Sequence, residues 1–319
     1  MRKSLDKIRG ALLGVAVGDA LGAPLEFMSA EEIRQKHGTV REMIGGGWLN
    51  VAPGEITDDT QMTLAVAEGI AESPSDPIPA IGRRFIEWYD SQPKDIGNCC
   101  RAAIAHAKQI KAHNVEGWFT AASLTHEETH GQTAGNGALM RTIYPALFYQ
   151  RVNTRVNEPS IGRVARYTAG AIGAMTHLHA DSTLAILAYT EAVAEIIGVD
   201  EDIYRLPGVG TGYGKERIEW RMKRVRELTD ESNLRPDGYV LNSLVCAINA
   251  IRDTSSFEDA LVCAVNLGGD ADTIGAITGG LAGALYGARE IPRRWTDALD
   301  EGIKRRIERL AKTAHRVKA

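Results

Sequence analysis

Two short segments, far apart in the chain, combine carboxylates with hydroxyls. Residues 57–60 read Thr-Asp-Asp-Thr and residues 270–273 read Asp-Ala-Asp-Thr, and each stands at the start of a stretch with helical periodicity. Glu26 follows the first helical stretch of the chain and is a third source of negative charge. Neither segment contains a lysine or arginine, so carboxylates that met in space would need a cation between them. Carboxylate, hydroxyl and water oxygens are hard ligands, and they predict a binuclear Mg²⁺, Mn²⁺ or Ca²⁺ site.

Helix capping is the alternative explanation for the same residues. Asp and Thr accept hydrogen bonds from the free N–H groups at a helix start, and Asp58 with Gln61 fits a capping box. Acids in the first turn are also favoured by the helix dipole. Capping explains one acid in each segment better than it explains the second, and the spacing alone leaves both explanations open.

A zinc-protease pattern occurs once, where residues 126–130 read His-Glu-Glu-Thr-His. In that pattern two histidines one helical turn apart hold the metal and the first glutamate activates water. The pattern belongs inside a helix, but here the loop-like residues 131–135, Gly-Gln-Thr-Ala-Gly, follow at once. The segment is therefore interpreted as a polar helix end.

Several other polar positions are candidates for lining a cleft, and each has a structural alternative. The alternatives are turn and cap residues, a flexible link between helices, a hydrogen-bonded histidine and a core ring. His177 and His179 are two residues apart and would point to different sides of a helix, which argues against a bidentate metal pair. The candidates are Asp95, Asn98, Gly135, Asn136, Gly137, His177, His179 and Tyr239.

Two helical stretches carry glycine at every fourth position. The first has Gly10, Gly14, Gly18 and Gly22, and the other has Gly275, Gly279, Gly283 and Gly287. Residues four apart share one helix face, so each helix presents a groove without side chains. Each glycine costs about 1 kcal/mol against alanine inside a helix, which indicates a compensating packing role. We expect both helices to lie deep in the core, where the two stripes could bring the two acid segments together.

The composition describes an ordinary globular protein. The chain has 319 residues, a mass of 34.5 kDa, a formal net charge of −4 and a sequence pI near 6.1, which disfavours a nucleic-acid binder. The four cysteines form no C-x-x-C pair, so neither a disulfide framework nor a zinc ribbon is indicated. The apolar run of residues 11–17 resembles a signal peptide, but it is short and Asp19 interrupts its end. A soluble, cytoplasmic protein without membrane partners is expected.

Apolar residues recur with helical spacing along nearly the whole chain, and hardly any segment alternates like a strand. This pattern predicts a single all-α domain spanning residues 1–319, with short connections and one long surface loop from Val199 to Lys215. The expected helices cover residues 5–22, 58–72, 79–91, 98–111, 117–126, 137–150, 162–175, 180–197, 215–229, 237–252, 256–266, 271–287 and 294–316.

Taken together, these motifs resemble the ADP-ribosylglycohydrolase family. The matching strings run in order over most of the chain, and the ordered set is far more specific than any one of them. They are G-D-A-L-G-A-P-L-E-F at 18–27, G-G-G-W at 45–48, I-T-D-D-T-Q-M at 56–62, D-I-G-N at 95–98, G-N-G-A-L-M-R at 135–141, T-H-L-H at 176–179, Gly238-Tyr239, and N-L-G-G-D-A-D-T-I-G-A at 266–276.

The resemblance implies a compact multi-helix fold with two Mg²⁺ or Mn²⁺ ions in a central cleft. It implies metal-binding roles for Thr57, Asp58, Asp59, Asp270, Asp272 and Thr273. It implies that Glu26 lies close to the metals and that the substrate is lined by Asp95, Gly97, Asn98, Gly135, Asn136, Gly137, His177, His179 and Tyr239. Our hypothesis is that Glu26 or Asp95 transfers the proton.

The activity implied by the resemblance is hydrolysis of the bond between ADP-ribose and an acceptor side chain of a modified protein, most often arginine. Three alternatives remain at this stage. The first is another ADP-ribose linkage, on serine, in O-acetyl-ADP-ribose or at a nucleic-acid end. The second is a catalytically silent relative that binds ADP-ribose or is structural, and the third is the zinc protease.

Overall fold

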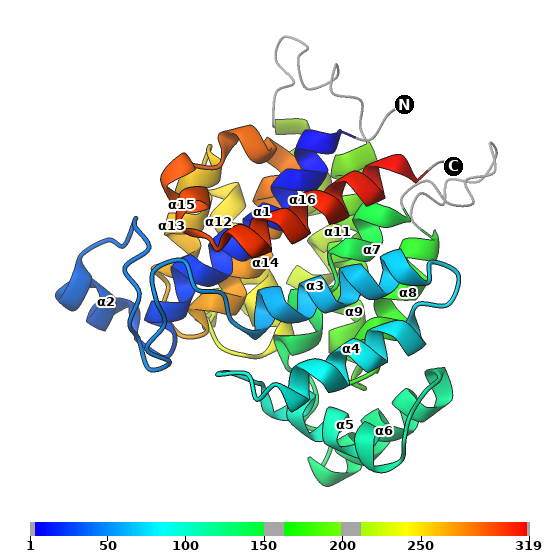
Figure 1. The fold of residues 1–319 in the computed structure, drawn as a ribbon. Helices are drawn as coiled ribbons and strands as arrows, with labels where there is room; N and C mark the ends of the chain where they lie inside the picture. Colours follow the sequence, from blue (N-terminus) through cyan, green and yellow to red (C-terminus); the bar gives the residue numbers. More distant parts are fainter. Residues whose placement is uncertain (1–3, 150–162, 199–211, 318–319) are drawn as a thin grey trace.

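The computed structural model describes residues 4–149, 163–198 and 212–317, and within these ranges it holds helices and isolated β-bridges but no strand. The expected all-α class is confirmed (Figure 1). The first helices are α1 Leu5–Gly22, α2 Ala30–His37, α3 Asp58–Glu72, α4 Ile78–Asp90, α5 Asn98–Gln109, α6 Val115–Glu128, α7 Tyr144–Phe148 and α8 Arg163–Ala174. They are followed by α9 Ala180–Gly198, α11 Gly212–Glu227, α12 Val240–Arg252, α13 Phe257–Val265, α14 Ala271–Tyr286, α15 Arg293–Ala298 and α16 Glu301–Arg316. Short 3₁₀ helices cover Ala23–Leu25, Asn136–Arg141, Glu231–Asn233 and Ala288–Glu290.

The two glycine-striped helices, α1 and α14, pack against each other at the centre of the molecule (Figure 1). They run antiparallel, and a Cβ atom added at Gly14 would collide with the carbonyl group of Gly279. The same close approach repeats along the whole contact, so the expected packing role of the stripes is confirmed. The facing pairs are Gly10 with Gly283, Gly14 with Gly279, Gly18 with Gly275, and Gly22 with Ala271.

This pairing joins the end of α1 to the start of α14. Just beyond α1, the N–H of Phe27 donates to the carbonyl of Gly269, and the N–H of Gly269 donates to the carbonyl of Met28, each at 2.7 Å. The segment that carries Glu26 therefore lies against the segment that carries Asp270, although most of the chain separates them in sequence.

Helix α1 also explains the apolar character of the N-terminus. The stretch Leu5–Leu25 is long and apolar enough to cross a membrane by length and composition, but 89% of its apolar window is buried inside the protein. A core helix surrounded by other helices has the same composition. Its burial therefore accounts for the run that resembles a signal peptide.

Two expected helices are interrupted and one further helix was not expected, each for a local reason. The stretch 137–150 is not one helix, because Pro145 cannot donate a hydrogen bond and its ring would clash with the preceding turn. The stretch 294–316 breaks before α16, where the Asp300 side chain accepts from the N–H groups of Gly302 and Ile303. Helix α2 was not expected, because it buries only Ile33 and so lacks an apolar stripe.

The long loop expected from Val199 to Lys215 falls mostly outside the described residues. The last part of that stretch is helical, since α11 begins at Gly212.

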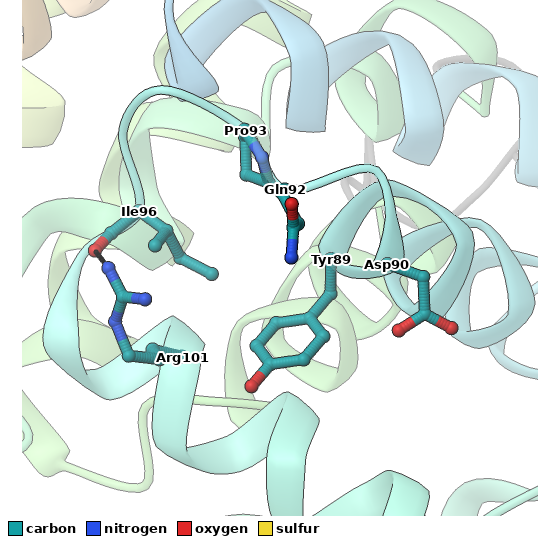
Figure 2. A pocket seen from close by; sticks show the side chains of 6 residues that line it. All are labelled: Tyr89, Asp90, Gln92, Pro93, Ile96 and Arg101. Atoms are coloured by element: carbon teal, nitrogen blue, oxygen red, sulfur yellow. Dashed lines mark hydrogen bonds between the residues drawn. The ribbon is translucent and has the colours of Figure 1, made fainter.

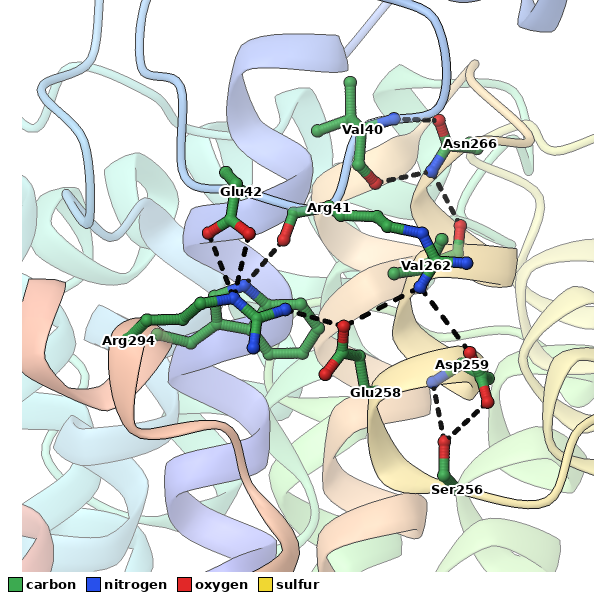
Figure 3. A network of polar contacts seen from close by, with 10 residues as sticks. Val40, Arg41, Glu42, Ser256, Glu258, Asp259, Val262, Asn266 and Arg294 are labelled. Carbon is green, nitrogen blue, oxygen red and sulfur yellow. Dashed lines mark hydrogen bonds and ion pairs between the residues drawn. The ribbon is translucent and has the colours of Figure 1, made fainter.

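The segment between α2 and α3 has little helix of its own and is tied to the C-terminal part of the chain (Figure 3). The side chain of Asn266 makes two hydrogen bonds of 2.9 Å to the backbone of Val40. Arg294 donates to Glu42 at 2.9 Å and to Glu258 at 2.6 Å. These contacts fix the loop that leads to Trp48.

Candidate active site

A cavity of about 590 Å³ opens at the end of the α1–α14 pair. Carboxylates reach it from the turn after α1, from the start of α3, from the loop before α5 and from the start of α14. The acids in its lining are Glu26, Asp58, Asp95, Asp270 and Asp272, and Thr273 lies beside them.

The centre of this cluster is tight. Glu26, Asp95 and Asp272 each place one carboxylate oxygen within 4.8 Å of the others. Among the described residues, no ion pair neutralises them, so burial and mutual repulsion act together. Burial first, and then neighbouring carboxylates, hold the pKa values of Asp58 and Asp272 well above the ordinary range. Burial likewise raises the pKa of Glu26 to about 8.

A second layer of ligand atoms lies beneath the first. Asp59 is fully buried, and its Oδ1 atom has no hydrogen-bond partner among the described residues. Its Oδ2 atom lies 3.4 Å from both the Thr57 and the Thr273 hydroxyl, which come from opposite ends of the chain. A buried carboxylate oxygen without a donor is costly unless a cation takes its charge. The donor set of oxygens therefore fits a hard divalent metal ion.

Capping of α3 is performed from outside the helix, by Asp19 of α1. The buried Asp19 carboxylate accepts from the N–H and hydroxyl groups of both Thr57 and Thr60. Thr57 is the N-cap residue but makes no side-chain capping bond, and Asp58 lies within the helix. The capping box considered for Asp58 and Gln61 is therefore absent, and the Asp58 side chain remains available to the cavity.

The glycine turn of residues 135–137 forms one wall of the cavity. It is paired to the start of α12: the N–H of Asn136 donates to the Gly238 carbonyl at 3.0 Å, and Gly135 forms a bridge with Tyr239. The Asn136 amide then donates to Asp270 Oδ2 at 2.8 Å. The structure thus brings the turn, residues 238–239 and the acid segment together.

His177 faces the same wall and is held by a buried network. Arg141 Nη2 donates to the Thr176 hydroxyl at 2.6 Å, and that hydroxyl lies 2.7 Å from His177 Nδ1. Because a guanidinium only donates, the hydroxyl proton can go to Nδ1, which leaves the ring proton on Nε2. A Cβ atom at Gly135 would come within 3.2 Å of Nε2, so glycine makes room for the ring. Burial, followed by the charge of Arg141, lowers the pKa of His177 to about 3.

The remaining candidates lie at the edge of the site. Gly97 and Asn98 are exposed and line the cavity at the start of α5. Tyr239 and His179 are not part of the lining; the Tyr239 hydroxyl donates to Asp181 at 2.8 Å, and His179 Nδ1 accepts from the Asp181 N–H at 3.1 Å. His177 and His179 therefore do not face the cavity together.

The zinc-protease interpretation is not supported by the geometry. Helix α6 ends at Glu128, and His130 follows in a left-handed conformation with φ 50°, so the histidines are not one turn apart on a helix. His126 Nδ1 lies 2.8 Å from the Thr133 hydroxyl instead. The segment is a helix end, as expected.

A smaller cavity of about 370 Å³ adjoins the main one between α4 and α5 (Figure 2). The two share Ile96 and Arg101, and Arg101 donates to the Ile96 carbonyl at 3.4 Å. Arg101 is thus a positive charge at the boundary between the two cavities.

Three residues of the site were not singled out from the sequence. Asp19 interrupts an apolar run and stands inside the matched string at 18–27, but it had no assigned role. Trp48 Nε1 donates to Glu26 Oε2 at 2.6 Å and fixes that carboxylate. Arg141 is fully buried and supports His177 through Thr176. Trp48 and Arg141 stood inside matched strings but had no assigned role.

The fold and site define an all-helical protein with a buried carboxylate centre suited to metal-assisted hydrolysis. The ADP-ribosylglycohydrolase family model matches residues 1–319. The chain is 36% identical to the ADP-ribosyl-dinitrogen reductase glycohydrolase of Rhodospirillum rubrum over 305 residues, which cover 95% of this chain and 94% of that one. It is 32% identical to the ADP-ribosylarginine hydrolase Tri1 of Serratia proteamaculans, covering 97% of this chain and 79% of that one.

A solved structure agrees with these sequence matches. The chain of an "ADP-ribosylglycohydrolase-related protein complex" superposes with a TM-score of 0.75 at 30% identity, covering 98% of both chains. This protein therefore belongs to the ADP-ribosylglycohydrolase family, whose members are hydrolases.

Proposed function

We propose that this protein is a metal-dependent hydrolase that removes ADP-ribose from arginine side chains of modified proteins and so reverses mono-ADP-ribosylation. The observation that carries the proposal is the convergence of Glu26, Asp95 and Asp272 within 4.8 Å, at the floor of a cavity with room for a nucleotide-sugar. The relatives named for arginine-linked or dinitrogen reductase-linked ADP-ribose support the choice of linkage.

Two divalent cations, Mg²⁺ or Mn²⁺, are the proposed cofactors. Their ligands would be Thr57, Asp58, Asp59, Asp270, Asp272 and Thr273. When bound, such ions neutralise the carboxylates and polarise sugar hydroxyls and water. Asp19 positions the first group of ligands by holding the start of α3.

The reaction breaks the bond from the anomeric carbon of ribose to a guanidinium nitrogen. A water oxygen forms the new bond to that carbon, one water proton leaves, and the arginine nitrogen regains a proton, giving ADP-ribose and free arginine. Because the sugar becomes cation-like as the bond breaks, the surrounding carboxylates stabilise the transition state.

Glu26 is the residue placed to move the proton. Its Oε2 atom accepts from Trp48 Nε1 at 2.6 Å, and its side chain is also hydrogen-bonded to Asp272. The carboxyl group borders the cavity in which water and the leaving nitrogen would lie. Asp95, which also lines the cavity, is the alternative proton carrier and otherwise orients water. Elsewhere in the lining, the Nε2–H of His177, the exposed backbone at Gly97 and the half-buried backbone at Gly135 would hold the nucleotide part of the substrate.

The deciding experiment measures ADP-ribose released from an ADP-ribosylarginine peptide in Mn²⁺, Mg²⁺ or EDTA. Release with metal and none with EDTA is expected. Parallel assays with serine-linked and O-acetyl-linked ADP-ribose and with an ADP-ribosylated nucleic-acid end test the linkage, and faster release from one of those would overturn the arginine assignment. Glu26→Gln should lose most of the activity while retaining metal binding, and Asp95→Asn separates the two proton-carrier assignments.

The setting proposed for this activity is the cytoplasm, where modified proteins would be the partners and ADP-ribose the product. The chain would act as one catalytic domain over residues 1–319.

A further inference from the structure

A second hollow adjoins the acid-lined cavity on the side of Glu26. This outer groove has a volume of about 630 Å³, and it shares Glu26, Phe27 and Trp48 with the main cavity. Its far wall is α2, which stands out from the body of the protein and contributes Glu32, Gln35 and Lys36 to the lining (Figure 1). A molecule bound in the main cavity can therefore continue past Glu26 into the groove.

The boundary between the two hollows is a pair of exposed aromatic rings. Phe27 is 68% exposed and Trp48 is 53% exposed. Their ring centroids lie 5.3 Å apart with the planes tilted by 42°, so they form one continuous apolar surface. Large adjacent apolar side chains left in solvent mark interaction sites more often than single ones do.

The two rings are held outward by backbone conformations that are energetically unfavourable for most residues. Phe27 has φ 65°, a left-handed conformation that is rare for a bulky residue, and its N–H is fixed to Gly269 by the 2.7 Å bond. Trp48 follows Gly47, which has φ 70° and where a Cβ atom would come within 2.8 Å of the Pro24 backbone. Strain of this kind persists where surrounding structure imposes it, and it clusters at functional sites.

The chemistry of the boundary fits a cation with an aliphatic stem. Aromatic faces attract a guanidinium and pack against methylene groups. The carboxylate of Glu32 adds negative charge to the groove, and Lys36 lies in the same lining. The cavity in Figure 2 differs in this respect, because its acid, Asp90, and its ring, Tyr89, both already contact Lys108, and Arg101 is a further cation in its lining. Of the two neighbours of the main cavity, the outer groove is the one that matches an arginine acceptor.

We propose that the outer groove binds the polypeptide that carries the ADP-ribosylated arginine, with the Phe27–Trp48 pair against the arginine side chain and α2 along the flanking residues. This inference rests on the proposed function and adds the acceptor side of the substrate to it. Glu26 then lies at the junction of the two hollows, between the sugar and the departing arginine.

The first test is Phe27→Ala, assayed with an ADP-ribosylarginine peptide, together with the affinity for free ADP-ribose. The value of kcat/KM should fall about tenfold, because a cation–π contact and apolar packing are lost. The Kd for ADP-ribose, which lacks the acceptor, should change by less than about twofold. Tyr167→Ala removes a ring that is 83% exposed on α8 and is the matched control.

The second test fills the groove from α2. Gln35→Trp should lower the ratio of kcat/KM for an ADP-ribosylated protein to that for free ADP-ribosylarginine by about tenfold. Arg34→Trp adds the same ring at a neighbouring exposed position outside the groove lining and should leave that ratio as in the wild type. Thermal unfolding of each variant checks that the fold is retained.

The outcomes separate the two proposals. If the wild type releases ADP-ribose from neither arginine substrate, the proposed function itself is wrong. If the wild type is active but Phe27→Ala leaves the peptide reaction unchanged, or weakens ADP-ribose binding as strongly, the groove assignment is overturned. A ratio unaffected by Gln35→Trp overturns the part assigned to α2.

Discussion

Asp19, in the last turn of the core helix α1, caps a different helix by accepting the N–H and hydroxyl hydrogen bonds of Thr57. Asp19→Ala removes this support and leaves buried donors at the start of α3 without a partner. We expect metal affinity to fall between about tenfold and hundredfold, as is usual when a residue that positions metal ligands is lost. Titration calorimetry with Mn²⁺ measures the effect, and Asp6→Ala, which removes an acid near the start of the same helix, is the control. Unchanged affinity in Asp19→Ala would contradict this role.

The second prediction concerns the close contact between α1 and α14 and its effect on stability. Gly14→Ala should lower the free energy of unfolding by about 3 kcal/mol or more, because the new methyl group collides with the backbone of Gly279 and forces the helices apart. Gly170→Ala is the matched control, since its Cβ would meet only the Leu187 side chain at 3.8 Å. That control should be stabilised by about 0.5 to 1 kcal/mol. Urea unfolding of both variants decides the matter, and equal stabilities would refute the packing account.

Stability of the metal-free protein should depend on pH in an unusual direction. Burial raises the pKa of Glu26 to about 8 and that of Asp19 to about 6, so the folded state holds protons that the unfolded chain releases. Unfolding then releases protons, and stability must fall as pH rises from about 4 to 8. Thermal unfolding in EDTA should show this fall, and the stabilisation given by Mn²⁺ should grow over the same range.

Asp58→Asn provides the control for that pH series. It removes one of the carboxylates whose pKa is held well above the ordinary range by burial, so the slope in EDTA should become shallower. A metal-free melting temperature that rises with pH in the wild type would show that these carboxylates are not protonated in the folded state.

The support of His177 gives a fourth prediction. Thr176→Val keeps the shape of the side chain but removes the hydroxyl that links Arg141 to the ring. We expect kcat/KM to fall about tenfold and stability to fall by about 1 to 3 kcal/mol, because Arg141 Nη2 loses an acceptor. Thr176→Ser should restore most of both. Thr278→Val, which loses only a bond within its own helix, should affect stability slightly and activity not at all.

The parts of the site that could be predicted from sequence are those with a local signal. Asp58 and Asp272 stand in acid and hydroxyl segments without basic neighbours, and the glycine stripes of α1 and α14 are regular enough to be read directly. Asp19 could not be assigned, because its capping partners begin almost forty residues later and belong to another helix. The tie between Trp48 and Glu26 was hidden for a similar reason, since it depends on a loop anchored to the C-terminal part of the chain.

The helix boundaries also divide into those with a local signal in the sequence and those without one. The apolar residues around Tyr144 are buried as expected, but periodicity cannot reveal that Pro145 interrupts the helix unless the proline is weighed against it. Helix α2 has little apolar periodicity, yet its capping box of Ser29 and Glu32 is a purely local signal that could have found it. The contacts of Asp19 with Thr57 and of Trp48 with Glu26, in contrast, have no such local signature.

The pairing of α1 with α14 has a consequence for how the protein matures. Gly10 finds its partner at Gly283, so the central contact closes one of the longest loops that the chain can form. Contacts of such high sequence separation slow folding and cannot form until both partners exist. On the ribosome, the glycine groove of α1 has no partner until α14 has been synthesised. Products that end before α14 therefore cannot assemble the acid cluster, and activity can begin only after α14 has been synthesised.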